Sequence, residues 1–138
     1  MREKGIKYVA VAAGDSLLGL GGVGGVILHP SRQYVSPSGE APHGLNNGSV
    51  VLHLSYGKSS ILLTGDIEHE TDPDLLRWTS RLESDVLKAA HHGSRTSSTR
   101  NFLAGVKSKL VLVSCGVKNK FRHPVPEVID RYKELDIE

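Results

Sequence analysis

The chain has 138 residues, the length of one domain, and its 38% hydrophobic and 23% charged residues are typical of a globular protein. The formal net charge of +2 permits an anionic partner without establishing one, and the single Cys115 excludes an internal disulfide framework and a four-cysteine zinc site. The most apolar stretch, residues 17–28, is too short and too rich in glycine to cross a bilayer, so the chain is expected to be soluble as given, in a compartment that the sequence leaves open.

The N-terminal third of the chain contains few regular patterns. Residues 6–12 are predicted to form a short strand, and Gly14-Asp15 a turn. Another apolar run follows at residues 23–28, interrupted by two glycines and closed by His29-Pro30. Residues 31–48 are rich in Ser, Pro, Gly and Asn without periodicity, which indicates an exposed loop.

An antiparallel hairpin is predicted next. Residues 49–55 and 59–64 flank Tyr56-Gly57-Lys58, a short turn that contains glycine. The second of these strands contains Ile61-Leu62-Leu63 without alternation, which is typical of a strand covered on both faces. We therefore expect this strand in the interior of a sheet.

Beyond Gly65 the sequence alternates between helix and strand patterns. Two strands are predicted, over 85–90 and 110–114. The first helix has Asp72 as N-cap and carries Leu75, Leu76, Trp78 and Leu82, and the second is capped by Ser97 or Ser98 and carries Phe102, Leu103 and Val106. The last helix follows His123-Pro124 and has Val128 and Tyr132 on its apolar stripe. The alternation of the two patterns indicates an α/β layer structure.

Three of the predicted strands lead to residues of the types that bind metal ions. These residues are Asp66 after the first, His91 and His92 after the second, and His123 beyond the turn that follows the third. Because ligands gather at the carboxyl ends of strands in open α/β sheets, we expect these side chains to lie together. A carboxylate with neutral imidazoles suits Zn²⁺ and tolerates Mn²⁺ or Fe. Strand alternation alone does not decide which of the two adjacent histidines faces inward.

A polar cluster follows the two histidines. The hydroxyls of Ser94, Thr96 and Ser97, together with the positive charge of Arg95, are candidates for binding phosphate oxygens. The same residue types are also common in helix caps and turns, where their hydroxyls bond to the neighbouring backbone. Both interpretations are open at this point.

Four segments together resemble one known family. They are NNGSVVL at 46–52, ILLTGDIE at 61–68, DVLKAAHHGSRTSS at 85–98, and His123-Pro124. In order and spacing they resemble the C-terminal portion of the metallo-β-lactamase-type domain of ComEC competence proteins. That resemblance implies a four-layer αββα sandwich and a dinuclear site, commonly of zinc or manganese, where metal-activated water attacks an ester, amide or phosphodiester.

The resemblance also implies roles for individual residues. Asp66 is implied as the ligand that bridges two metal ions, the pair of His91 and His92 as the source of a further ligand, and His123 as a ligand or a contact to the substrate and leaving group. Asp66, His92 and His123 are therefore the expected catalytic residues. The implied substrate is DNA, and the parent family is associated with membranes in bacteria.

The sequence departs from the family in one respect. The H-x-H-x-D-H motif, which supplies most of the family's ligands, does not occur in it. We therefore expect residues 1–138 to form a single partial domain, the C-terminal half of the sandwich, as a mixed sheet with helices on one face. Its candidate ligands suffice for one tetrahedral metal but not for two. Its other sheet face would need the missing half, a second copy or another chain to cover it.

Two functions are compatible with these expectations. The first is a metal-dependent hydrolase domain acting on phosphodiesters in a complete protein, with the isolated chain binding Zn²⁺ or Mn²⁺ weakly and hydrolysing poorly or not at all. The second is a non-catalytic module, derived from the same fold, that binds DNA or protein. The absent motif and the slight basic excess favour the second.

Overall fold

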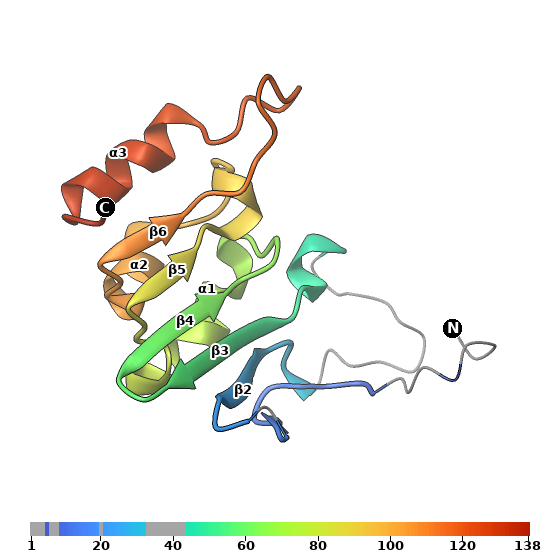
Figure 1. The fold of residues 1–138 in the computed structure, drawn as a ribbon. Helices are drawn as coiled ribbons and strands as arrows, with labels where there is room; N and C mark the ends of the chain where they lie inside the picture. Colours follow the sequence, from blue (N-terminus) through green and yellow to red (C-terminus); the bar gives the residue numbers. More distant parts are fainter. Residues whose placement is uncertain (1–4, 6–8, 20, 33–43) are drawn as a thin grey trace.

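The computed structural model describes residues 5, 9–19, 21–32 and 44–138 (Figure 1). Within these residues, six strands form one sheet and follow each other in chain order. They are β1 (Ser16–Leu17), β2 (Gly24–His29), β3 (Val51–Tyr56), β4 (Ser59–Leu63), β5 (Val86–Lys88) and β6 (Leu110–Leu112). Neighbouring strands from β1 to β4 are antiparallel, whereas β4, β5 and β6 run parallel, so the sheet is mixed as predicted.

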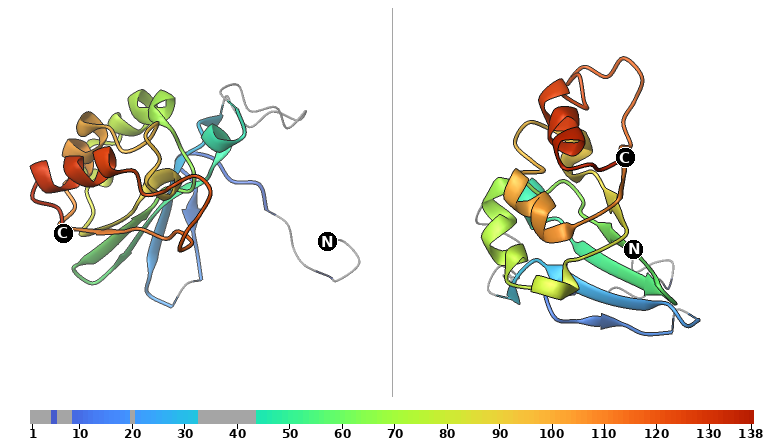
Figure 2. Two further views of the ribbon diagram at one scale, coloured as in Figure 1. Left: turned by 90° about the horizontal axis from the view of Figure 1, so that it is seen from above. Right: turned by 90° about the vertical axis from the view of Figure 1, so that its left-hand side faces the viewer.

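The three α-helices of the described part of the chain lie on one side of this sheet, as the left view of Figure 2 shows. They are α1 (Asp72–Leu76), α2 (Arg100–Val106) and α3 (Pro126–Glu134). Each of the parallel connections passes through a helical segment before the chain returns to the sheet, which is the geometry that parallel strands require. The predicted α/β class, with helices on one face of a mixed sheet, is confirmed.

The predicted hairpin is also confirmed. Strands β3 and β4 pair antiparallel with Tyr56 opposite Ser59, and Gly57 occupies the turn with a φ of +59°. A left-handed φ is strained for other residues, so glycine suits this tight connection. The hairpin places β4 at the centre of the sheet, next to β5.

Several predicted boundaries were wrong. Residues 9–12 form no strand, residues 6–8 lie outside the described part, and the first strand is β1 instead. Most of the predicted loop at 31–48 also lies outside the described residues, and its described end contains a short 3₁₀ turn at Asn46–Gly48. Local apolar character alone does not form a strand, because a strand also needs a neighbour with which to pair.

The first two helices also differ from their predicted ends. Helix α1 begins after Thr71 rather than after Asp72 and stops at Leu76, and Thr79, three residues further on, has a left-handed φ of 45°, which does not continue a helix. The indole N–H of Trp78 donates to the Leu28 carbonyl of β2. Helix α2 is capped by Thr99, whose hydroxyl accepts from the Phe102 N–H. The predicted caps, Ser97 and Ser98, use their hydroxyls in other contacts.

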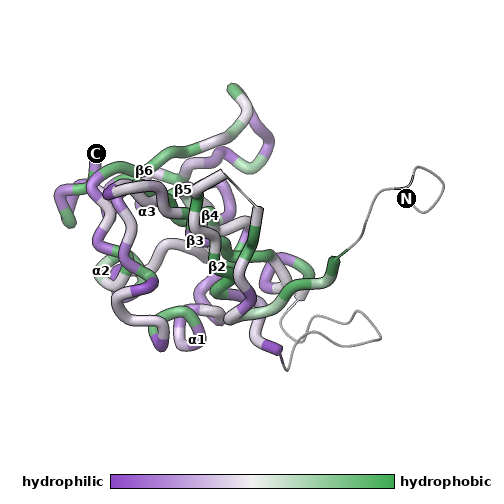
Figure 3. The backbone as a smooth tube through the Cα atoms, turned by 60° about the horizontal axis from the view of Figure 1, so that its bottom comes forward, coloured by the Kyte–Doolittle hydropathy of each residue, from purple (hydrophilic) through white to green (hydrophobic). Residues whose placement is uncertain are grey.

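The core lies between the sheet and the helices. Its largest fully buried side chains include Leu62, Leu87, Leu75, Leu82, Phe102 and Leu103. The opposite face of the sheet is also apolar but less covered: Leu110 is 39% and Leu112 49% exposed. Figure 3 shows the hydrophobic stretches, in green, running through the sheet. On β4 itself Leu62 is fully buried, whereas Ile61 and Leu63, on the other face, are only partly buried. The expectation that this strand is covered on both faces therefore holds fully for one face only.

None of the described helices has the length and apolar character needed to cross a bilayer.

Candidate metal centre at the carboxyl ends of strands β4, β5 and β6

Backbone contacts hold the ends of the parallel strands at one edge of the sheet. The Thr64 hydroxyl donates to the Lys88 carbonyl at 2.8 Å, and the His91 N–H donates to the Gly65 carbonyl at 3.1 Å. Gly65 has a φ of +59°, and a Cβ there would lie 2.6 Å from the Ser49 Cβ. Glycine is therefore required immediately before Asp66, and the turn that presents this carboxylate is closely packed.

Asp66 and His92 are candidate ligands in direct contact. The His92 Nε2 lies 3.3 Å from the Asp66 Oδ1, and the His92 Nδ1 lies 2.6 Å from the Ser114 carbonyl oxygen. A carbonyl only accepts, so the Nδ1 carries the hydrogen and the lone pair of the neutral ring is on Nε2, towards Asp66. Two lone-pair donors at this separation match neighbouring corners of a zinc tetrahedron with bonds of roughly 2.0–2.2 Å. These two atoms therefore suit a divalent cation.

The other predicted ligands lie at the same edge. The His91 ring centroid is 5.7 Å from that of His123 and 6.5 Å from that of His92. Within the described part of the chain, however, no three His, Cys, Asp or Glu side chains converge closely enough to hold a metal ion by themselves. The residues predicted from sequence are thus neighbours, and their role as ligands stays a prediction.

The backbone explains why both adjacent histidines reach this edge. His91 and His92 have φ values of 46° and 55°, in the left-handed region, within a short 3₁₀ segment at Ala90–Gly93. In a continued strand their side chains would point to opposite faces. The left-handed turn costs of order 1–2 kcal/mol per residue, so the surrounding structure must enforce it. Such strain is concentrated at functional sites.

Two residues that the sequence analysis did not single out contribute to this edge. The Glu68 Oε1 lies 3.4 Å from the His91 Nδ1, a buried nitrogen with no hydrogen bond of ordinary geometry, and accepts a hydrogen bond of 2.6 Å from the Thr96 hydroxyl. A carboxylate beside a ligand imidazole orients the ring and raises its basicity. The Lys88 Nζ donates to the Gly65 carbonyl and lies 3.7 Å from the Asp66 Oδ1. The sequence could have indicated Lys88, because it is a charged residue in an otherwise apolar strand.

The candidate phosphate cluster is mostly engaged in contacts within the chain. Ser97 is 1% exposed, and its hydroxyl donates to the Ala90 and Ser94 carbonyls. The hydroxyls of Ser94 and Thr96 lie 3.1 Å apart, within hydrogen-bonding distance. Arg95 is exposed, with its Nε 3.1 Å from a Glu127 carboxylate oxygen. The structure thus supports the turn interpretation for the hydroxyls, and the burial of Ser97 argues against direct contact with a phosphate.

Burial lowers the pKa of His123 from its ordinary value of 6.5, and the nearby His91 and His92 lower it further. In the metal-free chain the NMR titration of His123 is therefore expected to have a midpoint below 6.5. Since the unfolded chain binds this proton more readily, His123 destabilises the fold as the pH falls from 6.5 through its folded pKa. In the variant His91→Gln the midpoint should move back up, and an unchanged midpoint would contradict the contribution of His91.

The fold and the edge define a class of protein. A mixed sheet covered by helices on one face, with Asp and His side chains at the ends of its parallel strands, is an α/β domain with potential metal ligands at one edge of its sheet. A family model described as "Metallo-beta-lactamase superfamily" matches residues 35–117, more than half of the chain, and the chain belongs to that superfamily. The match includes Asp66, His91 and His92, whereas His123 lies beyond it.

Curated relatives support a more specific resemblance. The chain is 32% identical to "ComE operon protein 3" of Bacillus subtilis over 128 residues, which cover 93% of this chain and 16% of that protein. It is 35% identical to "Recombination protein 2" of Haemophilus influenzae over 104 residues, 73% of this chain and 13% of that protein. "Competence protein ComA" of Neisseria gonorrhoeae is 32% identical over 102 residues, with coverages of 73% and 15%. The predicted resemblance to competence proteins is confirmed, and the chain spans less than a fifth of the length of these relatives.

Proposed function

We propose that this chain is the C-terminal part of a metal-dependent hydrolase domain that acts on phosphodiesters, DNA above all, and that it supplies part of the metal site. The observation that carries the proposal is the pair of Asp66 and His92, whose lone-pair atoms face each other at 3.3 Å while the opposite ring nitrogen is bonded to the Ser114 carbonyl. With the ring hydrogen on Nδ1, the His92 Nε2 lone pair and the Asp66 carboxylate are both acceptors. A divalent cation satisfies both.

The chain's own residues would serve that site in distinct ways. A bound Zn²⁺ or Mn²⁺ supplies a positive charge that polarises a phosphoryl oxygen and acidifies water. Asp66 would hold the ion through its carboxylate, and Glu68, 3.4 Å from the His91 Nδ1, would orient that ring. His123 stays neutral over a wider pH range because its pKa is lowered, so it can contact the substrate or leaving group without adding charge.

The remaining ligands come, in this proposal, from another segment of a longer protein. The chain contains no H-x-H-x-D-H motif, and the relatives it matches are more than five times as long as the matched region. The half-exposed apolar face of the sheet, with Leu110 and Leu112, is the surface on which we place that segment. Light scattering checks the alternative, since a dimer of the isolated chain would favour a second copy.

Metal titration tests the proposal directly. Calorimetry with Zn²⁺ and Mn²⁺ is expected to show weak binding by the chain, and Asp66→Asn or His92→Gln should weaken it by about 10- to 100-fold or more, because each removes or neutralises one of the two facing atoms. His53→Gln is the matched control, because His53 lies on β3 and its Nε2 contacts the Glu83 carbonyl instead. Equal affinities for all four proteins would refute the proposed site.

A non-catalytic binding module is the second candidate. It is favoured by one observation, the lack of any three convergent ligand side chains among the described residues. DNA binding in the presence of metal that survives both Asp66→Asn and His92→Gln would favour this candidate. Hydrolysis of a phosphodiester reporter by the metal-loaded chain would favour the enzyme, and turnover at the rate of a complete enzyme would show that the site needs no further ligands.

A further inference from the structure

The loop after β6 carries positive charge that no described acidic residue neutralises. We call residues 116–123, GVKNKFRH, the basic loop; it contains Lys118, Lys120 and Arg122 and no Asp or Glu. None of these three cations makes an ion pair with a residue of the described part of the chain. The loop therefore presents an attractive surface to an anion.

A second group of cations shows the contrast. Arg95, Arg100 and Arg131 line another pocket, but Glu127 pairs with Arg95 and Arg131, and Glu134 pairs with Arg100 at 2.6 Å. An incoming phosphate would have to compete with carboxylates already in place there. The unpaired cations of the basic loop offer the better anion surface.

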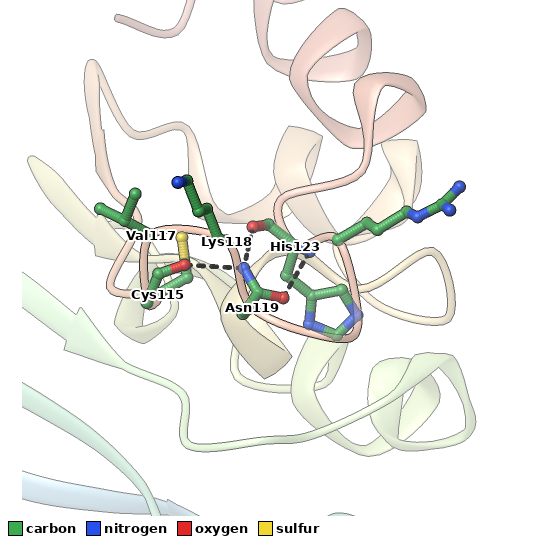
Figure 4. Close-up of a pocket in the computed structure, with 7 residues that line it drawn as sticks. Cys115, Val117, Lys118, Asn119 and His123 are labelled. Atoms are coloured by element: carbon green, nitrogen blue, oxygen red, sulfur yellow. Dashed lines mark hydrogen bonds between the residues drawn. The ribbon is translucent and has the colours of Figure 1, made fainter.

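Hydrogen bonds from one side chain hold the basic loop in shape. The Asn119 Nδ2 donates to the carbonyls of Gly116 and His123, at 2.9 and 2.7 Å, and its Oδ1 accepts from the His123 N–H at 3.0 Å (Figure 4). Lys118 and Arg122 both have left-handed φ values, of 60° and 58°. An open pocket of about 370 Å³ lies against the loop, between Cys115 and His123. The loop is thus a formed surface, attached directly to the candidate metal centre through His123.

An exposed aromatic ring lies among these cations. Phe121 is 65% exposed, and its ring stacks on that of His123, with centroids 5.7 Å apart and planes 30° from parallel. The Lys120 ammonium lies 4.9 Å from the centre of the Phe121 ring. Cations that alternate with an exposed aromatic ring are the pattern by which proteins bind unpaired nucleotides.

We propose that the basic loop binds single-stranded nucleic acid, with Lys118, Lys120 and Arg122 on the phosphates and a base stacked on Phe121. In a duplex the bases already stack on one another, so an exposed ring can accept only an unpaired base. The Lys120 side chain is long and flexible, and it leaves the ring for a phosphate when a base arrives. Stacking of Phe121 on His123 then places the bound strand beside His91 and the candidate metal centre. The inference rests on the proposed function only for the hydrolysis of the bound strand, and not for its binding.

The electrostatic part is tested by fluorescence anisotropy of a labelled oligo(dT), measured in chelator over a range of salt concentrations. Each cation on a phosphate of a single strand contributes roughly 0.7 to the slope of log K against log salt, so the triple variant K118Q/K120Q/R122Q should lose about 2 from that slope. The matched control, K58Q/K107Q/K133Q, removes the same charge from other parts of the surface and should keep the slope. Equal losses in the two triple variants would overturn the proposal.

The aromatic part has its own variant. Phe121→Leu keeps an apolar side chain but removes the ring, and it should weaken oligo(dT) binding at least about five-fold while leaving binding of an abasic oligonucleotide of the same length unchanged. An unchanged affinity for oligo(dT) would overturn the proposal, as would tighter binding of a duplex of the same length. Because the chelator removes divalent metal, these results are independent of the metal titration, and either proposal can fail without the other.

Discussion

Replacing Gly93 with alanine is expected to lower the free energy of unfolding by about 2–4 kcal/mol. Gly93 has a φ of +82°, and a Cβ there would lie 2.6 Å from the Pro124 Cβ and 3.1 Å from the Pro124 Cα. The chain must therefore either strain the left-handed backbone or move the segment that holds His123. Chemical denaturation measures the loss of stability, and a metal titration of the same variant should show weaker binding.

Gly116→Ala is the matched control for this prediction. The nearest atom to a Cβ at Gly116 is the Asn119 Cβ at 3.9 Å, an ordinary contact. This variant should stay within roughly 0.5 kcal/mol of the parent chain, as surface substitutions usually do. If both alanine variants unfold at the same denaturant concentration, close packing of Gly93 against Pro124 does not hold the His123-Pro124 segment against the turn at Ala90–Gly93.

Replacing Leu87 with alanine is expected to cost about 2–5 kcal/mol, because the side chain is fully buried between the sheet and the helices and its removal leaves a cavity. Leu112 on the neighbouring strand points to the opposite face and is 49% exposed. Leu112→Ala should therefore cost less than about 1 kcal/mol. Both values come from denaturant unfolding of the purified chain.

The comparison between these two leucines measures how unequal the two sheet faces are. A high cost at Leu112, similar to that at Leu87, would show that the outer face is already covered in solution, for example by a second copy. The expected low cost would leave that face available to the segment that we propose to complete the metal site.

Part of the candidate site was predictable from the strand patterns. Asp66, His91, His92 and His123 follow strands whose apolar runs are long enough to recognise, and parallel strands end at a common edge. Glu68 was missed because a lone carboxylate after a turn has no distinctive local signal. Its relevance depends on contacts with His91 and Thr96, both more than twenty positions away.

Helix and strand boundaries were less predictable for a similar reason. The end of α1 is followed by the left-handed Thr79 and by Trp78, whose indole N–H donates to the Leu28 carbonyl, fifty residues earlier in the chain. The choice of Thr99 as the cap of α2 depends on the buried partners of the neighbouring serines, such as the Tyr132 hydroxyl 3.0 Å from the Ser98 hydroxyl. Local propensity does not contain these contacts.

The sequence by itself determined the class of the fold, the superfamily and the chemical types of the side chains at the candidate metal centre, because these depend on the order of short motifs and on apolar periodicity. Only the tertiary structure decided that His92 faces Asp66 and that His91 faces Glu68. The different orientations of the two histidines follow from their left-handed backbone and from the hydrogen bond between His92 and the Ser114 carbonyl. Both require β4, β5 and β6 to be paired, so no local stretch of the chain can specify them.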